Sequence, residues 1–220
     1  MPVASTLQDV DKLGKIVVIL DVFRSSNTIL ALLQAGAECV VPVLEIDIAM
    51  SLKKKHPEWV ALGERGGIKL DGFDGDNSPS FTPETIVGKT VVLTTSGGTR
   101  CINACSQDQQ AIIGSFANIS AIINTVRNYP PSTISFWAVG VAGTKSAVED
   151  EECAREMENR LLGLPYDPSA TDRAIRNGPG AEQLRQQNKL DDLEYCCSRD
   201  ITTLVPKLRK LPNKLVGFTC

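Results

Sequence analysis

Apolar residues are distributed along the chain in two alternating patterns. Short, nearly continuous apolar runs are typical of buried strands, and between them apolar residues recur at helical spacing. The predicted strands span residues 16–20, 38–44, 59–63, 90–95, 111–115 and 133–139, and a last apolar segment, 215–218, is predicted to be an edge strand or a tail. The predicted helices span residues 29–36, 46–55, a segment beginning at 101–105, 119–128, 149–162, 169–175, 181–189 and 191–197. This alternation predicts an α/β fold, a three-layer α/β/α sandwich with a mostly parallel or mixed central sheet.

Polar side chains gather where the first predicted strand ends. The stretch 16–28 reads IVVILDVFRSSNT, a buried strand followed by Asp21, Arg24 and a run of hydroxyl and amide residues before a helix. In open α/β sheets ligands bind outside the carboxyl ends of the strands, where the free N–H groups of helix N-termini converge. A ligand site is therefore predicted here. The alternative is structural: Asp21 pairs with Arg24 while Ser26 or Asn27 caps the helix.

The fourth predicted strand ends in a second polar turn. The sequence TTSGGTR, residues 94–100, places small polar residues and Arg100 directly before a helix. Such a turn supplies backbone N–H groups and hydroxyls to an anion, although it lacks the spacing of a P-loop, and no GxGxxG follows any strand. The alternative is a plain tight turn in which Gly97 or Gly98 provides a positive φ.

Two further segments carry candidate chemistry. The segment 64–83, ERGGIKLDGFDGDNSPSFTP, is long and irregular, and its Ile68, Phe73 and Phe81 predict an ordered loop folded over the sheet edge. The acidic run 149–152 follows Lys145 at the start of a predicted helix. Acidic residues in a first helical turn are also favoured by the helix macrodipole, so this run has a structural explanation of its own.

Length, composition and charge limit the possible classes of protein. At 220 residues, 42% hydrophobic and 22% charged, the chain is predicted to form a single domain over residues 1–220. A formal net charge of −3 with scattered basic residues argues against a nucleic-acid partner. No apolar run is long enough to span a membrane and the first residues do not resemble a signal peptide, so a cytoplasmic location without a membrane partner is expected.

Cysteine and histidine usage excludes several mechanisms. The seven cysteines have no CxxC spacing, which favours free thiols over disulfides or a zinc site. None is followed six residues later by the Arg of a cysteine-dependent phosphatase loop. The one histidine, His56, follows three lysines and precedes Pro57, as expected of a solvated helix end. The histidine usage thus argues against Ser-His-Asp catalysis and histidine-rich metal sites.

Five motifs follow one another along the chain: DVFRSSNT (21–28), GERGG (63–67) with GFDGDNSP (72–79), LTTSGGTR (93–100), GSFAN (114–118) and VEDEECA (148–154). In these motifs and in their order the chain resembles the 2-phosphosulfolactate phosphatase family. The resemblance implies a magnesium-dependent acid phosphatase with a three-layer α/β/α fold, of the kind that acts on the route to coenzyme M. Its implied substrate is a phosphorylated small 2-hydroxy acid such as a sulfolactate.

The resemblance, together with the chemistry of phosphate ester hydrolysis, assigns roles to particular residues. A cation must neutralise the transferring phosphoryl group, and Mg²⁺ prefers carboxylates and water. The expected Mg²⁺ ligands are Asp21, Glu64 and Asp150, with Glu149 as an alternate. The expected anion clamps are Arg24, Arg65 and Arg100, with Asp21, Arg24 and Arg100 as the catalytic set. The expected substrate-binding residues are Ser96, Gly98 and Thr99 around the phosphoryl group, Asn77 and Ser78 on the long loop, and Lys145.

Departures from the family pattern keep alternatives open. Gly97 stands where the family usually has Asn, which removes one amide from the site and motivates a non-catalytic binder of phosphorylated acidic metabolites as the alternative function. A haloacid-dehalogenase-type phosphatase would need a second acid at Phe23. The nucleophile, whether metal-bound water, Asp21 or Thr95, stays open. So do the physiological substrate and the oligomeric state, a homo-oligomer included.

Overall fold

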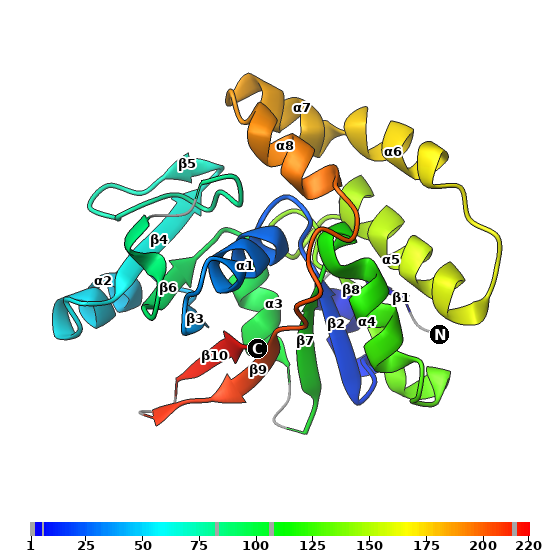
Figure 1. The fold of residues 1–220 in the computed structure, drawn as a ribbon, viewed down its shortest axis with the longest axis horizontal. Coiled ribbons are helices and arrows are strands. Elements are labelled where there is room, and N and C mark those ends of the chain that lie inside the picture. Colours follow the sequence, from blue (N-terminus) through cyan, green and yellow to red (C-terminus); the bar gives the residue numbers. More distant parts are fainter. Residues whose placement is uncertain (1–2, 6, 82–83, 106–107, 213–214) are drawn as a thin grey trace.

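The computed structural model describes residues 3–5, 7–81, 84–105, 108–212 and 215–220 (Figure 1). Its strands are β1 (Val3–Ser5), β2 (Ile16–Leu20), β3 (Cys39–Pro42), β4 (Val60–Arg65), β5 (Ile68–Lys69), β6 (Thr90–Thr94), β7 (Gln110–Gly114), β8 (Ile134–Ala138), β9 (Lys207–Lys210) and β10 (Val216–Thr219). Its α-helices are α1 (Ser25–Gln34), α2 (Ile46–Lys55), α3 (Gly98–Ala104), α4 (Ile119–Val126), α5 (Val148–Leu162), α6 (Pro168–Arg176), α7 (Pro179–Gln186) and α8 (Leu190–Cys197). Short 3₁₀ turns lie at Leu7–Lys12, Glu84–Ile86, Phe116–Asn118 and Pro131–Thr133.

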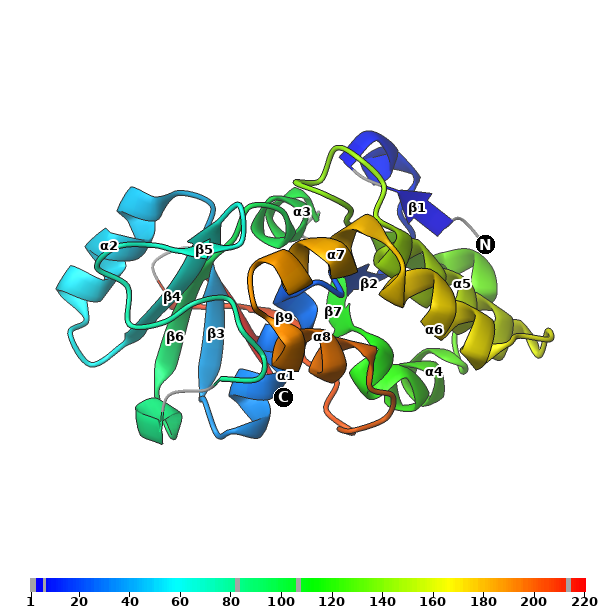
Figure 2. The ribbon, with the colours of Figure 1, turned by 90° about the horizontal axis from the view of Figure 1, so that it is seen from above.

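The described strands form one mixed sheet in the order β1-β8-β2-β7-β9-β10-β3-β6-β4-β5. It consists of two parallel groups: β1, β8, β2 and β7 pair in parallel on one side, and β3, β6 and β4 do so on the other. Helices cover both faces of this sheet (Figures 1 and 2). The predicted α/β class with a mixed central sheet is therefore confirmed.

The antiparallel hairpin β9–β10 joins the two parallel groups. β9 pairs with β7 through Ile112 and Lys207, and β10 pairs with β3 through Val40 and Phe218. The prediction of an edge strand or a tail for residues 215–218 is thus wrong, because this segment becomes an internal strand. Phe218 is fully buried in the core beneath this strand, and burying its apolar ring favours an internal position for the segment.

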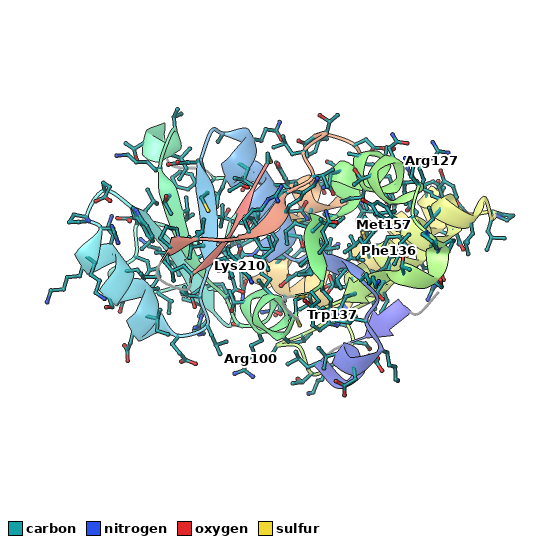
Figure 3. All side chains as sticks on the ribbon, turned by 90° about the horizontal axis from the view of Figure 1, so that it is seen from below. Arg100, Arg127, Phe136, Trp137, Met157 and Lys210 are labelled. Atoms are coloured by element: carbon teal, nitrogen blue, oxygen red, sulfur yellow. The ribbon has the colours of Figure 1, made fainter. Side chains whose placement is uncertain are left out.

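Alternation along β2 shows why it lies in the centre of its group. Ile16, Val18 and Leu20 pack into one cluster with α4 and α5, whereas Val17 and Ile19 pack into another that also holds residues of α1 and α3. Successive residues of a strand point to opposite faces, so a strand apolar at every position must be covered on both sides. Neighbouring residues of β8 divide in the same way, and Figure 3 labels two of them, Phe136 and Trp137.

Two helices carry the chain between the parallel groups, and their starts meet. α1 leads from β2 to β3 in the other group, and α3 returns from β6 to β7. A Cβ added to Gly98 would lie 2.2 Å from the Ser25 Oγ and 2.7 Å from the Asp21 Oδ2, so only glycine permits this approach. In Figures 1 and 2 α7 and α8 lie across the end of the sheet where these helices begin. A chain crossover of this kind is where α/β proteins place their ligands.

The predicted long loop is ordered over its described part, 64–81. It contains β5, which pairs with β4, and Phe73 packs against the cluster that contains Val41 and Ala49. Ile68 and Phe81, which were also expected to hold the loop down, are largely exposed. Residues 82 and 83, the predicted end of the loop, lie outside the described residues.

Six predicted strands correspond to β2, β3, β4, β6, β7 and β8, and the predicted helix 46–55 has the bounds of α2. The first helix begins earlier than predicted, at Ser25, because the polar run of the predicted turn forms its first turn. None of the described helices combines the length and apolar character that a membrane span requires.

Candidate active site

A pocket of about 350 Å³ opens where the carboxyl ends of several strands converge. Asp21 follows β2, Glu64 lies near the end of β4, Thr95 follows β6 and Gly140 lies beyond β8. The remaining lining residues are Phe23, Arg24, Gly66, Gly67, Asn77, Ser96, Gly97, Val141, Ala142, Ala147, Glu149, Asp150, Pro179, Gly180, Gln183, Leu184 and Gln187. Residues from strands far apart in the sequence therefore share one cavity, beneath α7.

The N-termini of α1, α5 and α7 border this pocket. Arg24 precedes α1, Ala147 precedes α5, and Pro179 and Gly180 form the first turn of α7. The first N–H groups of a helix lack intrahelical acceptors, so their partial positive charge favours an anion. The pocket is thus suited to negative charge at its rim.

Four carboxylates line the same pocket: Asp21, Glu64, Glu149 and Asp150. Burial raises the pKa of Asp21, and the negative charge of Glu64 adds to that effect. Burial raises the pKa of Glu149 to about 7 and that of Asp150 well above its ordinary value, and the charge of Asp21 raises both further. The charge of Asp21 therefore raises the pKa of two of its neighbours, and Asp21, Glu149 and Asp150 resist simultaneous ionisation.

Backbone N–H groups hold two of these carboxylates in place. Asp150 accepts hydrogen bonds from the Val22 N–H at 2.7 Å and the Gly140 N–H at 2.8 Å. Glu64 accepts from the Gly67 N–H at 2.6 Å and the Ser96 N–H at 2.7 Å. Each of these contacts joins a carboxylate to a different loop of the pocket, so the acidic groups also fix the pocket wall.

The other two carboxylates contact groups close to them in the sequence. Asp21 accepts from the Ser25 Oγ–H at 2.9 Å and from the Ser25 N–H at 3.3 Å, and the Glu149 side chain interacts with its own backbone. Within the described residues no three acidic, cysteine or histidine side chains gather closely enough to hold a metal ion by themselves. The predicted direct set of Asp21, Glu64 and Asp150 is thus not assembled in this geometry, in which each of the three accepts hydrogen bonds from backbone N–H groups. Mg²⁺ keeps several waters and often takes only one or two carboxylates, so the oxygen-rich pocket still fits this ion.

Arg24 is the arginine that lines the pocket within the described part of the chain. It is only 3% exposed, and its Nη1 lies 2.6 Å from the Asp192 Oδ2 and 3.6 Å from the Asp76 Oδ2. The Lys189 Nζ lies 2.5 Å from the same Asp76 oxygen. Two positive and two negative groups therefore form a balanced cluster beside the acidic pocket.

The other predicted cations lie elsewhere. Arg65 turns away from the pocket and donates to the Leu44 carbonyl and the Thr94 hydroxyl, both at 2.9 Å. Lys145 and Arg100 are exposed and neither lines the pocket. Figure 3 shows the Arg100 side chain at the edge of the molecule, directed away from the ribbon. The structure thus brings one of the three predicted arginine clamps to the site.

The predicted substrate-binding residues divide between lining and support. Asn77 and Ser96 line the pocket, and the Ser96 Oγ–H donates to Glu64. Ser78 donates to Asp192 at 2.6 Å and so supports the ion cluster instead. Gly98 packs against Asp21 and Ser25, and the Thr99 hydroxyl donates to the Thr95 carbonyl at 3.1 Å. Gly98 and Thr99 therefore shape the turn beneath the pocket without lining it.

Three buried oxygen atoms on pocket residues have no hydrogen-bond partner within the described structure. They are the Asn77 Oδ1, the Thr95 Oγ1 and the Gln187 Oε1. Buried polar atoms in folded proteins are almost always satisfied, so exceptions that cluster around one cavity indicate a ligand or water there.

Sequence reasoning missed the contributions of α7 and α8. Gln183 on α7 and Gln187 directly after it line the pocket, and Asp192 on α8 holds Arg24. In the sequence these residues look like the polar residues of an ordinary solvent-exposed helix face. Only the paired Asp191 and Asp192 after Lys189 marked a charged helix start, and that pattern does not tell which of the two acids turns inward.

Comparison with known proteins decides the family. A model of the 2-phosphosulpholactate phosphatase family matches residues 3–210. The chain belongs to this family. It is 38% identical over 216 residues to a "Probable 2-phosphosulfolactate phosphatase" of Caldicellulosiruptor saccharolyticus, covering 88% of this chain and 89% of that protein. It is 30% identical over 211 residues to a protein of the same name from Clostridium tetani, covering 89% and 90% of the two chains.

The motifs shared with the 2-phosphosulfolactate phosphatase family have two kinds of role. DVFRSSNT, GERGG, LTTSGGTR and VEDEECA each supply residues that line the pocket, and GFDGDNSP supplies Asn77. GSFAN does not reach it: Asn118 accepts from the Ser115 N–H at 2.9 Å and donates to the Leu204 carbonyl at 2.8 Å. That motif therefore builds the connection between β7 and α4, and the segment before β9 packs on it.

Proposed function

We propose that this chain is a magnesium-dependent phosphate monoester hydrolase that acts on a phosphorylated small 2-hydroxy acid, with 2-phosphosulfolactate as the first substrate to test. The single observation that carries the proposal is one pocket that contains four carboxylates, one arginine and several helix N-termini. Family membership supports the reaction class, and the donor set supports the metal.

Electrostatics supports a bound cation. A substrate with a phosphate and a second acidic group would bring further negative charge to four carboxylates, while Arg24 is already paired with Asp192. Unit charges a few ångströms apart repel strongly in a partly buried site, so a divalent cation must offset them. Carboxylates and water are the ligands that Mg²⁺ takes, and its double charge would stabilise the transferring phosphoryl group.

Asp21 is the central metal ligand in this proposal. Its charge raises the pKa of Glu149 and Asp150, and the second ligand of the metal would come from Glu149, Asp150 or Glu64, directly or through water. The backbone contacts of Asp150 and Glu64 position these two carboxylates before the substrate arrives. Little rearrangement is then needed at the moment of reaction, which is the condition for strong electrostatic catalysis.

Arg24 and the pocket amides bind the substrate's anionic groups. The guanidinium is fixed by Asp192 and by the fold, so its planar donors meet a phosphate or sulfonate without losing much conformational freedom. Asn77 lines the pocket from the long loop, and Gln187 lines it from the residue after α7. The side-chain carbonyl oxygens of both residues have no hydrogen-bond partner among the described residues. They are suited to orient the hydroxy-acid part of the substrate.

Phosphate release tests the proposal. Purified protein is mixed with 2-phosphosulfolactate, 2-phospholactate and 2-phosphoglycolate, with Mg²⁺ or with EDTA, and inorganic phosphate is measured. We expect release that requires Mg²⁺ and falls by about two or more orders of magnitude in Asp21→Asn. Metal-dependent binding without release would favour a non-catalytic binder. Release that is undiminished in EDTA would remove the metal from the mechanism.

A further inference from the structure

Thr95 differs from the other hydroxyl residues around the pocket. It follows β6, lines the pocket, and is 3% exposed. Its Oγ1 is buried and has no hydrogen-bond partner within the described structure. The adjacent Thr94 hydroxyl donates to the Leu44 carbonyl at 3.2 Å and accepts from Arg65 at 2.9 Å. Two neighbouring threonines on one strand end are thus chemically distinct.

The protein satisfies the serine hydroxyls nearby as well. The Ser25 Oγ–H donates to Asp21, and the Ser96 oxygen accepts from the Gly66 N–H while its hydroxyl faces Glu64. Among the hydroxyl groups around the pocket, that of Thr95 therefore stands apart, and it shares its lack of a partner with the Asn77 and Gln187 carbonyl oxygens. A buried hydroxyl without a partner destabilises the fold, and valine would fill the same space without that cost.

We propose that the Thr95 hydroxyl donates a hydrogen bond to a phosphoryl oxygen of the bound substrate. The inference rests on the proposed function and adds to it a substrate-binding residue. A hydroxyl is an apt donor in this position because it is neutral and does not compete with the carboxylates for the cation. The missing partner is then supplied by the ligand, as expected of a site complementary to its bound state.

The same geometry argues against Thr95 as the nucleophile. A threonine becomes nucleophilic when an adjacent base takes its proton, and the base must lie within hydrogen-bond reach. The Thr95 Oγ1 has no such acceptor among the described residues. Thr95 is thus a donor to the substrate rather than an attacking group.

Three variants separate binding from folding. Thr95→Val removes the hydroxyl and keeps the shape, Thr95→Ser keeps the hydroxyl and removes a methyl group, and Thr94→Val removes a hydroxyl that the protein already pairs. Phosphate release and thermal melting are measured for each variant and for the unaltered protein. Binding of inorganic phosphate with Mg²⁺ is measured in parallel by its effect on the melting temperature.

We expect opposite effects at the two neighbouring threonines. Thr95→Val should keep or raise the melting temperature and lower kcat/KM about 10- to 100-fold, as the loss of a hydrogen bond to a charged group does. Thr95→Ser should keep kcat/KM within about threefold and melt at a lower temperature. Thr94→Val should melt at a lower temperature with kcat/KM within about threefold.

Failure of this inference can be told from failure of the proposed function. If the unaltered protein releases phosphate and Thr95→Val does so equally well, Thr95 is not a substrate donor, although the enzyme assignment stands. A lower melting temperature in Thr95→Val, as in Thr94→Val, would also overturn the inference, because it would reveal a partner within the protein. If no substrate is hydrolysed, phosphate should still raise the melting temperature of the unaltered protein more than that of Thr95→Val.

Discussion

The guanidinium of Arg24 has two tasks that oppose each other. Asp192 and Asp76 hold it by charge, and Arg24 also lines the pocket in which we propose that the substrate binds. Lys189 balances Asp76, so the cluster can remain ionised in a nearly dry environment. The charge that positions Arg24 therefore also weakens its attraction for an anion, and this increases the need for the cation that we propose.

Substitutions at Arg24 and Arg100 should differ sharply. Arg24→Lys keeps a charge but loses the planar fork, and we expect kcat/KM to fall about tenfold or more, because a hydrogen bond to a charged group contributes about 1.5–3 kcal/mol. Arg100→Ala should leave kcat/KM within about threefold and the free energy of unfolding within about 0.5 kcal/mol, as at other exposed positions. Steady-state phosphate release and urea unfolding measure both quantities.

The outcome also tests the role that the sequence predicted for Arg100. A loss of about two orders of magnitude in Arg100→Ala would restore Arg100 as a phosphoryl clamp and would require α3 to move toward the pocket. Arg127→Ala is a matched control, since Arg127 is exposed and distant from α3 in Figure 3.

The cysteines should prove structural. Cys153 is fully buried, and burial raises its pKa well above the ordinary value, which keeps the thiol protonated and unreactive. Cys153→Ala should lower the free energy of unfolding by about 1 kcal/mol and leave kcat/KM unchanged, because a small buried thiol contributes packing. Thermal melting and phosphate release provide the test, and a folded but inactive variant would contradict it. The same result is expected for Cys101→Ala.

At the scale of elements, Asp192 joins three segments. From α8 it accepts hydrogen bonds from Ser78 and Ser80 on the long loop and pairs with Arg24 before α1. Burial favours the neutral acid, but these donors and the charge of Arg24 outweigh it and lower the pKa of Asp192. The helix α8, which follows the pocket-lining α7, is thus fastened to the long loop and to Arg24 by one carboxylate.

Asp192→Asn should destabilise the protein in a pH-dependent way. Removing one charge from a buried pair costs about 3–5 kcal/mol, and it leaves Arg24 with the longer, 3.6 Å contact to Asp76, which Lys189 also binds. A carboxylate with a lowered pKa stabilises the fold above its unfolded-state value, about 3.9, and this contribution is lost as the pH falls through the folded-state value. Urea unfolding at pH 7 and at about pH 3 should show a large difference between the two proteins at pH 7 and a smaller one in acid.

The exposed neighbour Asp191 is the control for this prediction. Asp191→Asn should cost less than about 1 kcal/mol, the value of one charge at a helix N-terminus. Equal effects of the two substitutions at pH 7 would show that the ion cluster contributes no more than the macrodipole.

These two acids also show where prediction from sequence ends. The strand ends that carry Asp21, Glu64 and the Ser-Gly turn were predictable, because an apolar run that stops at a polar residue marks the edge of a sheet. Asp191 and Asp192 have identical local explanations, yet one is exposed and the other is 1% exposed. The difference arises because α8 packs against the long loop and the start of α1. This contact joins residues far apart in the sequence, so the local sequence pattern does not predict it.

At the scale of the whole molecule, the site depends on two groups of strands. β2 and β8 precede Asp21 and Asp150, whereas β4 and β6 carry or precede Glu64 and Thr95. The hairpin β9–β10 connects these groups from the far end of the chain. Its apolar run is too short to identify its partners, which is why the sequence predicted only an edge strand or a tail there. Pairing across so many residues is decided by the available strand edges and by burial.

Phe218→Ala tests whether this hairpin couples the two groups. Phe218 is fully buried and packs with residues of both groups, so removing its ring should lower the free energy of unfolding by about 3–5 kcal/mol. The pocket takes its carboxylates from both groups of strands. On heating, activity and secondary structure should therefore be lost together, in the same transition. Circular dichroism and residual phosphate release at each temperature measure the two curves. Tyr129→Ala is the control, because this side chain is 44% exposed. It should change the free energy of unfolding by no more than about 0.5 kcal/mol. If Phe218→Ala is as mild as this control, or if activity disappears well before the secondary structure, the hairpin is a peripheral addition and other contacts hold the two groups together.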